Sequence, residues 1–111
     1  MEIAVTTDSD ITVFALQGRL DALSSPQLEE RISQWLEQPG DKLVFDLGEL
    51  DYISSAGLRV FLTTAKKMKA HNGKFGMAAL RENVKDVFTV SGFIAIIPSF
   101  DTLGAAKDAL R

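Results

Sequence analysis

The chain has 111 residues, a formal net charge of −3 and no cysteine. This length supports a single hydrophobic core and predicts one domain over residues 1–111. The absence of cysteine excludes disulfides, zinc–thiolate sites and cysteine catalysis. The basic residues form no single patch, which argues against nucleic-acid binding, and Met1–Val5 lacks both a basic leader and a long apolar run. The simplest interpretation is a cytoplasmic protein without a membrane partner.

Two strands are predicted at the start of the chain, Ile3–Val5 and Ile11–Leu16, joined by a polar turn at residues 7–10. Apolar residues alternate along the second segment, as in a strand with one buried face. We therefore expect an antiparallel hairpin. Gly18–Asp21 interrupts the alternation, and by itself Asp21 fits a polar turn before a helix.

The first predicted helix begins at Ser24-Ser25-Pro26, where serine caps the helix and proline suits its first turn. Gln27 is placed to complete a capping box with Ser24. Pro39-Gly40 ends the helix. Its apolar stripe consists of Leu28, Ile32, Trp35 and Leu36. A tryptophan on such a stripe is more often a core residue than a ligand-stacking one, so we expect Trp35 in the core.

The middle of the chain is predicted to be a buried central strand followed by a helix. Leu43–Leu47 is a short apolar run typical of such a strand, and Asp46 and Gly48 mark its end. A loop follows, and a helix starts at Ser54 or Ser55. The apolar positions of that helix recur at spacings of three and four, which places them on one face: Leu58, Phe61, Leu62, Ala65 and Met68.

The pair Ser54-Ser55 allows two compatible roles. A serine hydroxyl at a helix start accepts a hydrogen bond from a free backbone amide, so a simple N-cap is the more common explanation. The same amides and the helix dipole also tolerate a phosphate on a serine at this position. Ala56 and Gly57 keep the turn slim, which would let the active site of another protein approach.

The last part of the chain continues the alternation of strands and helices. His71-Asn72-Gly73 closes the central helix. We expect a strand at Phe75–Leu80, a helix at Glu82–Ser91, a strand at Ile94–Ile97, and a helix at Thr102–Leu110 capped by Asp101 or Thr102. Alternation of this kind predicts an α/β fold, a mixed sheet with four helices packed against it.

The string Ser54-Ser55-Ala56-Gly57-Leu58 resembles the core signature of STAS domains in bacterial anti-sigma factor antagonists, Asp-Ser-Ser/Thr-Gly-Leu. In that family the first serine is phosphorylated, so the resemblance implies Ser55 as the acceptor. Ser54 replaces the common Asp, which leaves it as a competing acceptor, and Ala56 replaces Ser or Thr. Gly18–Asp21 resembles the family's Gly-Glu-Leu-Asp, and Val87–Phe93 its Leu-Phe-x-x-Ser-Gly-Leu.

The resemblance also implies a function. An unphosphorylated antagonist binds a serine-kinase anti-sigma factor with a histidine-kinase-like ATPase fold, which then releases its sigma factor. Phosphorylation of Ser55 ends the interaction, and a PP2C-type phosphatase restores it. The implied partner-facing residues are Asp21, Ser54, Ser55, Ala56, Gly57 and Arg59. The chemistry belongs to the partners, so we expect no catalytic residue, metal or cofactor in this chain.

Two alternatives have different consequences. A hydrolase with Ser55 as nucleophile needs an adjacent base, but the only histidine, His71, lies roughly 24 Å away along the same helix. The Gly-x-Ser-x-Gly pattern of a nucleophile elbow is also missing. The other alternative is a STAS module of a transport or regulatory complex that works without phosphorylation. The fold would be the same, so only the behaviour of the serine separates it from an antagonist.

Overall fold

The computed structural model describes residues 1–37, 40 and 42–111, whose strands form one five-stranded sheet in the order β1-β2-β3-β4-β5. The strands are β1 (Glu2–Asp8), β2 (Ile11–Leu20), β3 (Lys42–Ile53), β4 (Lys74–Ala78) and β5 (Ser99–Phe100). The helices are α1 (Ser25–Glu37), α2 (Ser55–Ala70), α3 (Glu82–Val90), the short 3-10 helix η1 (Phe93–Ala95) and α4 (Leu103–Leu110). Only β1 runs antiparallel to its neighbour. The predicted α/β fold with a mixed sheet and four α-helices is confirmed.

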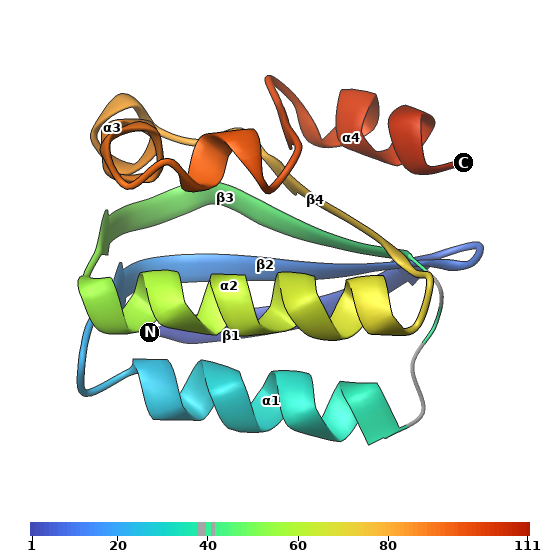
Figure 1. The fold of residues 1–111 in the computed structure, drawn as a ribbon, viewed down its shortest axis with the longest axis horizontal. Coiled ribbons are helices and arrows are strands. Elements are labelled where there is room, and N and C mark those ends of the chain that lie inside the picture. Colours follow the sequence, from blue (N-terminus) through green and yellow to red (C-terminus); the bar gives the residue numbers. More distant parts are fainter. Residues whose placement is uncertain (38–39, 41) are drawn as a thin grey trace.

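The helices cover both faces of the sheet. In Figure 1, α1 and α2 run together on one side of the strands, and α4 lies on the other side, above β3 and β4. Ala106 and Leu110 of α4 pack against Val13, Val44 and Ala78 of the sheet. The parallel strands β2, β3 and β4 are therefore buried between two layers, as parallel strands require, whereas β1 is largely exposed.

Phenylalanine side chains fill the larger core on the α1 and α2 side. Phe45 of β3 lies at its centre, with edge-to-face partners Phe14 (centroids 5.6 Å apart), Phe61 (4.7 Å) and Phe75 (5.5 Å). Phe61 of α2 continues the chain of contacts to Phe88 of α3 at 5.4 Å. Such pairs contribute about 0.5–1.5 kcal/mol each beyond burial. They join α2 and α3 to the centre of the sheet.

Trp35 packs at the edge of this core. Its indole N–H donates to the hydroxyl of Thr12 at 3.1 Å, and its ring lies edge-on to Phe14 at 6.4 Å. The side chain is half-buried. The predicted core role of Trp35 is confirmed. The predicted end of its helix at Pro39-Gly40 falls partly outside the described residues.

Strand β3 is longer than predicted, because it continues from Leu47 to Ile53 where a loop was expected. Two register shifts against β2 place one extra β3 residue between Ala15 and Gln17 of β2, and another between Gly18 and Arg19. Each bulge breaks the two-residue alternation. The buried side chains therefore recur every third residue, at Leu47, Leu50 and Ile53. A strand with this spacing lacks the alternation of apolar and polar residues by which strands are predicted from sequence.

The predicted strand at Ile94–Ile97 is wrong. Gly92 adopts a left-handed conformation (φ 82°), and the chain then forms η1, with the Ile97 amide donating to the Phe93 carbonyl at 2.9 Å. The short helical turn buries Ile97. The last strand, β5, lies beyond Pro98 and pairs with only two residues of β4. A run of apolar residues this short does not distinguish a strand from a buried turn.

Three ends of helices and strands could be assigned only from the structure. Ser24 and Gln27 form no capping box, since the Ser24 hydroxyl donates to the Arg19 carbonyl (2.7 Å) and the Gln27 side chain reaches the Met1 carbonyl (3.4 Å). Strand β4 stops at Ala78 rather than at Leu80, because Ala79 turns to a positive φ of 61°. Helix α4 is capped by Thr102, whose hydroxyl accepts from the Ala105 amide at 3.1 Å.

Candidate functional site

The candidate site lies where β2 and β3 end and α2 begins. The last residues of the two strands, Leu20 and Ile53, are register partners. Directly after them, the amide of Ser54 donates to the carbonyl of Leu20 at 2.9 Å. This hydrogen bond brings the turn that contains Asp21 beside the start of α2. Segments more than thirty positions apart in the sequence thus form one end of the molecule, as Figure 1 shows.

The two serines occupy different positions in the helix start. Ser54 is the N-cap, with extended backbone (φ −95°, ψ 174°), and its half-buried hydroxyl accepts a hydrogen bond from the Gly57 amide at 3.3 Å. Ser55 is the first helical residue, and its side chain is exposed. The Ser55 hydroxyl makes no hydrogen bond within the described residues. The cap and the accessible hydroxyl therefore belong to two neighbouring residues.

Gly57 allows α2 to begin directly against the strand ends. A Cβ atom at this position would lie 2.8 Å from Cγ of Leu20 and 2.9 Å from Cγ1 of Ile53, closer than packed carbon atoms approach. Gly57 is buried and Ala56 is half-buried. The glycine serves close packing here, and this packing fixes where Ser54 and Ser55 stand.

Asp21 holds the β2–α1 turn together. Its carboxylate accepts hydrogen bonds from the amides of Leu23 (3.0 Å) and Ser24 (3.1 Å). These bonds, the Ser24 amide foremost, hold the pKa of Asp21 below its ordinary value, against a smaller opposing effect of desolvation. The Asp21 carboxyl therefore stays ionised at neutral pH, so it places a negative charge next to the start of α2.

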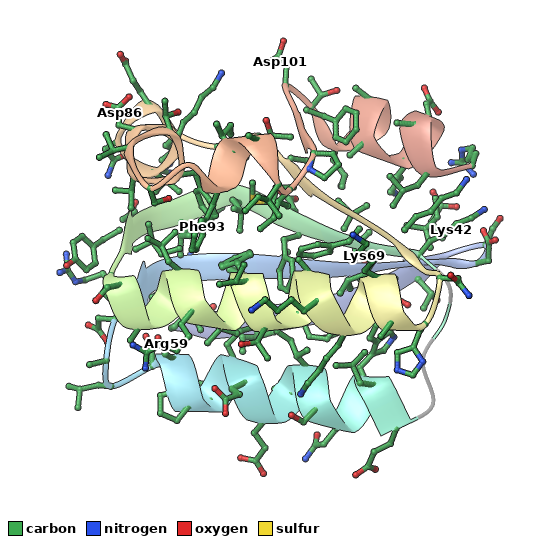
Figure 2. The ribbon with its side chains drawn as sticks, viewed as in Figure 1. Lys42, Arg59, Lys69, Asp86, Phe93 and Asp101 are labelled. Carbon is green, nitrogen blue, oxygen red and sulfur yellow. The ribbon has the colours of Figure 1, made fainter. Side chains whose placement is uncertain are left out.

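Arginines flank the site on two sides. The guanidinium of Arg19 stacks over the ring of Tyr52 at 4.2 Å from the centroid, a cation–π contact across the ends of β2 and β3. Figure 2 shows Arg59 extending from the start of α2 on the side of α1, and its side chain is exposed. The structure therefore gathers all six predicted site residues at this end of the molecule.

Exposed apolar side chains surround the site, and the sequence analysis did not single them out. Leu23, in the turn beside Asp21, is 92% exposed, and Val90 near the end of α3 is 88% exposed. Leu58, Val87 and Val90 line a shallow apolar hollow between α2 and α3. The sequence contained a signal for each: Leu23 is an apolar residue in a polar turn, and Val90 lies off the buried stripe of α3. A contiguous exposed apolar surface with a polar rim is typical of protein-binding sites.

Arg81 fixes the bulged end of β3 to the start of α3. Its Nε donates to the Gly48 carbonyl at 2.9 Å, and its guanidinium pairs with Asp51 and with Glu49 (3.5 Å). The neighbouring Asn83 side chain donates to the Asp51 carbonyl at 2.7 Å. The strand end that leads into Ser54 is thereby held in place from the α3 side.

The single histidine of the chain lies far from Ser55. His71 is the exposed C-cap of α2, at the opposite end of a 16-residue helix from Ser55. Within the described part of the chain, no three His, Cys, Asp or Glu side chains are grouped as metal ligands. No helix in these residues is long and apolar enough to cross a membrane.

Comparison with known proteins agrees with this geometry. Residues 2–106 match the family model of the STAS domain. A Bordetella bronchiseptica protein, BtrV, named as an anti-sigma factor antagonist, is 34% identical over all of this chain and 96% of its own length. The structure of an anti-sigma factor antagonist from Mycobacterium paratuberculosis superposes with a TM-score of 0.91 at 25% identity, covering 99% of this chain and 93% of that one. The Bacillus cell fate determinant SpoIIAA in its phosphorylated form shares the fold, with a TM-score of 0.78 at 20% identity over 99% of this chain and all of that one.

Proposed function

Since the chain belongs to the STAS domain family, we propose that it is an anti-sigma factor antagonist whose binding is switched off by phosphorylation of Ser55. Its unphosphorylated form would bind a serine-kinase anti-sigma factor through the end of the molecule that carries Ser55, and the anti-sigma factor would release its sigma factor. The observation that carries the proposal is the exposed Ser55 hydroxyl at the first position of α2.

The different environments of the two serines favour Ser55 as the phosphate acceptor. A kinase must place the attacking hydroxyl in line with the γ-phosphate of ATP, which requires an accessible side chain. The Ser54 hydroxyl is half-buried and accepts from the Gly57 amide. Phosphorylating Ser54 would disturb the cap, whereas a phosphate on Ser55 would stand in solvent near the free amides and the positive end of α2.

A phosphate on Ser55 would also change the surface that meets a partner. It adds up to about two negative charges. These charges would stand at the same end as the ionised Asp21 carboxylate and the apolar side chains of Leu23, Leu58 and Val90. Burying a phosphate against carboxylate and apolar groups costs both repulsion and desolvation. Loss of binding therefore needs no change of fold.

The catalytic chemistry belongs to the partners in this proposal. The kinase would be the anti-sigma factor itself, with a histidine-kinase-like ATPase fold, and a PP2C-type phosphatase would remove the phosphate. The STAS domain supplies the hydroxyl and the surrounding surface: Asp21, Ser54, Ala56, Gly57 and Arg59.

The proposal is tested by using Ser55→Ala and Ser55→Asp proteins as baits in lysate of the source cell, while wild-type protein is checked for added phosphate mass. We expect an ATPase with a histidine-kinase-like fold on the Ala bait, binding to the Asp bait weakened about tenfold or more, and phosphate on Ser55. A Ser54→Ala protein should still be phosphorylated, which makes it the matched control. If both Ser55 baits captured the same partners and the wild-type protein carried no phosphate, the protein would instead be a STAS module that works without phosphorylation.

A further inference from the structure

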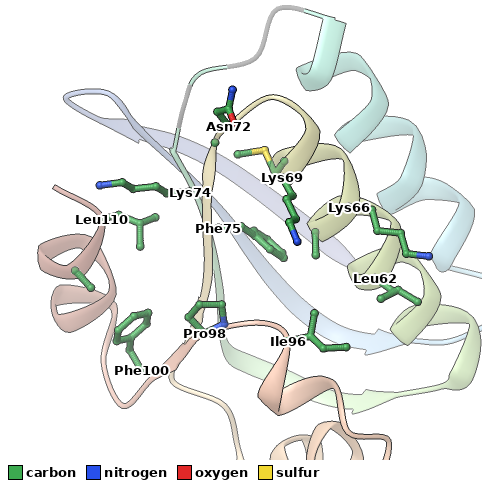
Figure 3. A pocket seen from close by; sticks show the side chains of 14 residues that line it. Leu62, Lys66, Lys69, Asn72, Lys74, Phe75, Ile96, Pro98, Phe100 and Leu110 are labelled. Carbon is green, nitrogen blue, oxygen red and sulfur yellow. The ribbon is translucent and has the colours of Figure 1, made fainter.

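A second concave surface lies at the other end of α2. Fourteen residues line a cleft of about 740 Å³, formed by the C-terminal half of α2, the start of β4, the segment around β5 and the end of α4 (Figure 3). Its accessible apolar surface comes from Leu62 and Ala65 of α2 and from Ile96, Pro98 and Phe100. The core residues Met68, Phe75 and Leu110 lie beneath it. The volume is within the range of small-molecule sites, about 300–1,000 Å³.

The cleft exists because β5 is short. Strand β5 pairs only with Met77 and Ala78, so the edge of residues 74–76 has no strand beside it in the described chain. The amides of Met77 and Ala79 donate across this edge, to Pro98 (2.9 Å) and Phe100 (3.0 Å). Alternate amides of a strand point to the same edge, so the Phe75 amide also points toward the cleft. The site therefore offers a backbone donor beside apolar walls.

The charge of the cleft is positive. Lys66, Lys69 and Lys74 belong to its lining, and no acidic residue does. Among the described residues, none of these lysines forms an ion pair. Figure 3 shows Lys69 pointing from α2 toward Phe75, with Lys66 and Lys74 on either side of the cleft. Three ammonium groups outweigh the partial negative charge of about one half at the C-terminus of α2.

We propose that this cleft binds an anionic amphiphile, namely a carboxylate that carries a hydrocarbon chain. The chain would lie against Leu62, Ile96 and Phe100, where it removes apolar surface from water. The carboxylate would meet the Lys69 ammonium and the Phe75 amide, which form charge-assisted hydrogen bonds. A quaternary ammonium amphiphile would satisfy the apolar walls but not these donors.

This site is separate from the proposed phosphorylation site. Ser55 opens α2, whereas Lys69 lies fourteen positions later, roughly 21 Å along the helix axis. Occupancy of the cleft therefore does not depend on the state of Ser55. A Ser55→Asp protein should bind the carboxylate as well as the wild type does, so failure of either proposal leaves the other intact.

Decanoate is the probe for this proposal, titrated below its aggregation concentration into methyl-labelled protein and followed by NMR. We expect saturable shifts at Met68, Ile96 and Leu110, which line the cleft, and none at Leu23 or Val90. Decyltrimethylammonium has the same chain with the opposite charge. It should bind at least about tenfold more weakly than decanoate, because its positive head group is repelled by the lysines.

Matched variants distinguish binding at the cleft from a general effect of positive surface charge. Lys69→Gln should weaken decanoate binding about fivefold to tenfold, whereas Lys67→Gln, which removes a charge from the same helix outside the cleft, should have little effect. Ala65→Trp should fill the cleft and abolish the shifts. Unfolding curves establish that each variant is folded.

The proposal would be overturned by equal affinity for the two amphiphiles, by equal effects of Lys67→Gln and Lys69→Gln, or by shifts at the cleft that grow with protein concentration alone. The last result would mean that a second copy of the chain occupies this surface. Undiminished binding to a folded Ala65→Trp protein would place decanoate elsewhere on the molecule.

Discussion

The two ends of α2 are built in opposite ways. At its start, Gly57 packs so closely against Leu20 and Ile53 that there is no room for a methyl group. At its end, the helix stops in a turn with Asn72 at a φ of 58°, and the surface beside it opens into the lysine-rimmed cleft. One end is tightly packed with a polar hydroxyl on its outside. The other leaves apolar walls uncovered.

Strand length explains the difference. At the start of α2, β2 and β3 run on through two bulges, and their last residues, Leu20 and Ile53, pack against Gly57 of the helix. At its end, β5 pairs with only two residues and leaves part of the β4 edge bare. Close packing at the start of α2 holds the exposed Ser55 hydroxyl at a defined place on the surface. A small-molecule site requires uncovered concave surface, which an incomplete sheet provides. The same helix therefore suits a different kind of recognition at each end.

The largest expected effect is one that damages both ends together. Phe45→Ala removes the centre of the aromatic cluster and should lower the free energy of unfolding by about 3–5 kcal/mol. Urea unfolding measures this loss, and NMR should show broad changes at both ends of α2. Val90→Ala is the control, because that side chain is exposed and its loss should cost less than about 0.5 kcal/mol. Equal destabilisation by the two changes would contradict the core assignment.

Gly57→Ala should damage only the tightly packed end. The added methyl group collides with Leu20 and Ile53, so we expect a loss of about 1–3 kcal/mol in unfolding free energy and weaker binding of the anti-sigma factor. Decanoate binding at the cleft should be unchanged. Gly104→Ala in α4 is the matched control. A Cβ there would meet only the Thr102 hydroxyl, at 4.0 Å, and the change should stabilise the helix by about 0.4–1 kcal/mol.

Substituting each serine in turn distinguishes the two roles at the start of α2. Ser54→Ala removes the N-cap and should lower the unfolding free energy by about 1 kcal/mol. Ser55→Ala should change it by less than about 0.5 kcal/mol, because the hydroxyl is exposed. Thermal unfolding of the two proteins in parallel makes the measurement. A reversed order, with Ser55→Ala the more costly, would show that the cap had been assigned to the wrong residue.

The smallest effect concerns acid stability of the turn beside the site. The pKa of Asp21 is lower in the folded chain than its ordinary value near 3.8. The ionised carboxylate therefore adds stability above that value, and the contribution disappears as the pH falls through the lowered pKa. Asp21→Asn should reduce stability at pH 5–7, and its difference from wild type should shrink below about pH 4. Urea midpoints across this range provide the test, and a pH-independent difference would exclude the charge as its source.

Local signals in the sequence located most of this site. The apolar spacing from Leu58 to Met68 predicts α2, and a serine pair before it predicts the cap, because both features depend on neighbours within a few residues. Of the two serines, Ser54 is the N-cap in the structure. That choice depends on the Ser54 amide reaching Leu20, which lies 34 positions earlier in the chain.

Long-range packing decided the rest. Bulges in β3 spread its buried residues to every third position, so alternation could not reveal the strand beyond Leu47. The run Ile94–Ile97 has the composition of a strand, but Gly92 and the core below it turn these residues into a short helix. The resulting short β5 is what leaves the cleft open. The order of the elements and the position of the serine pair could be predicted from local patterns, since helix periodicity and capping involve neighbours in the chain. The extent of each strand could not, because register and edge coverage depend on residues distant in the chain.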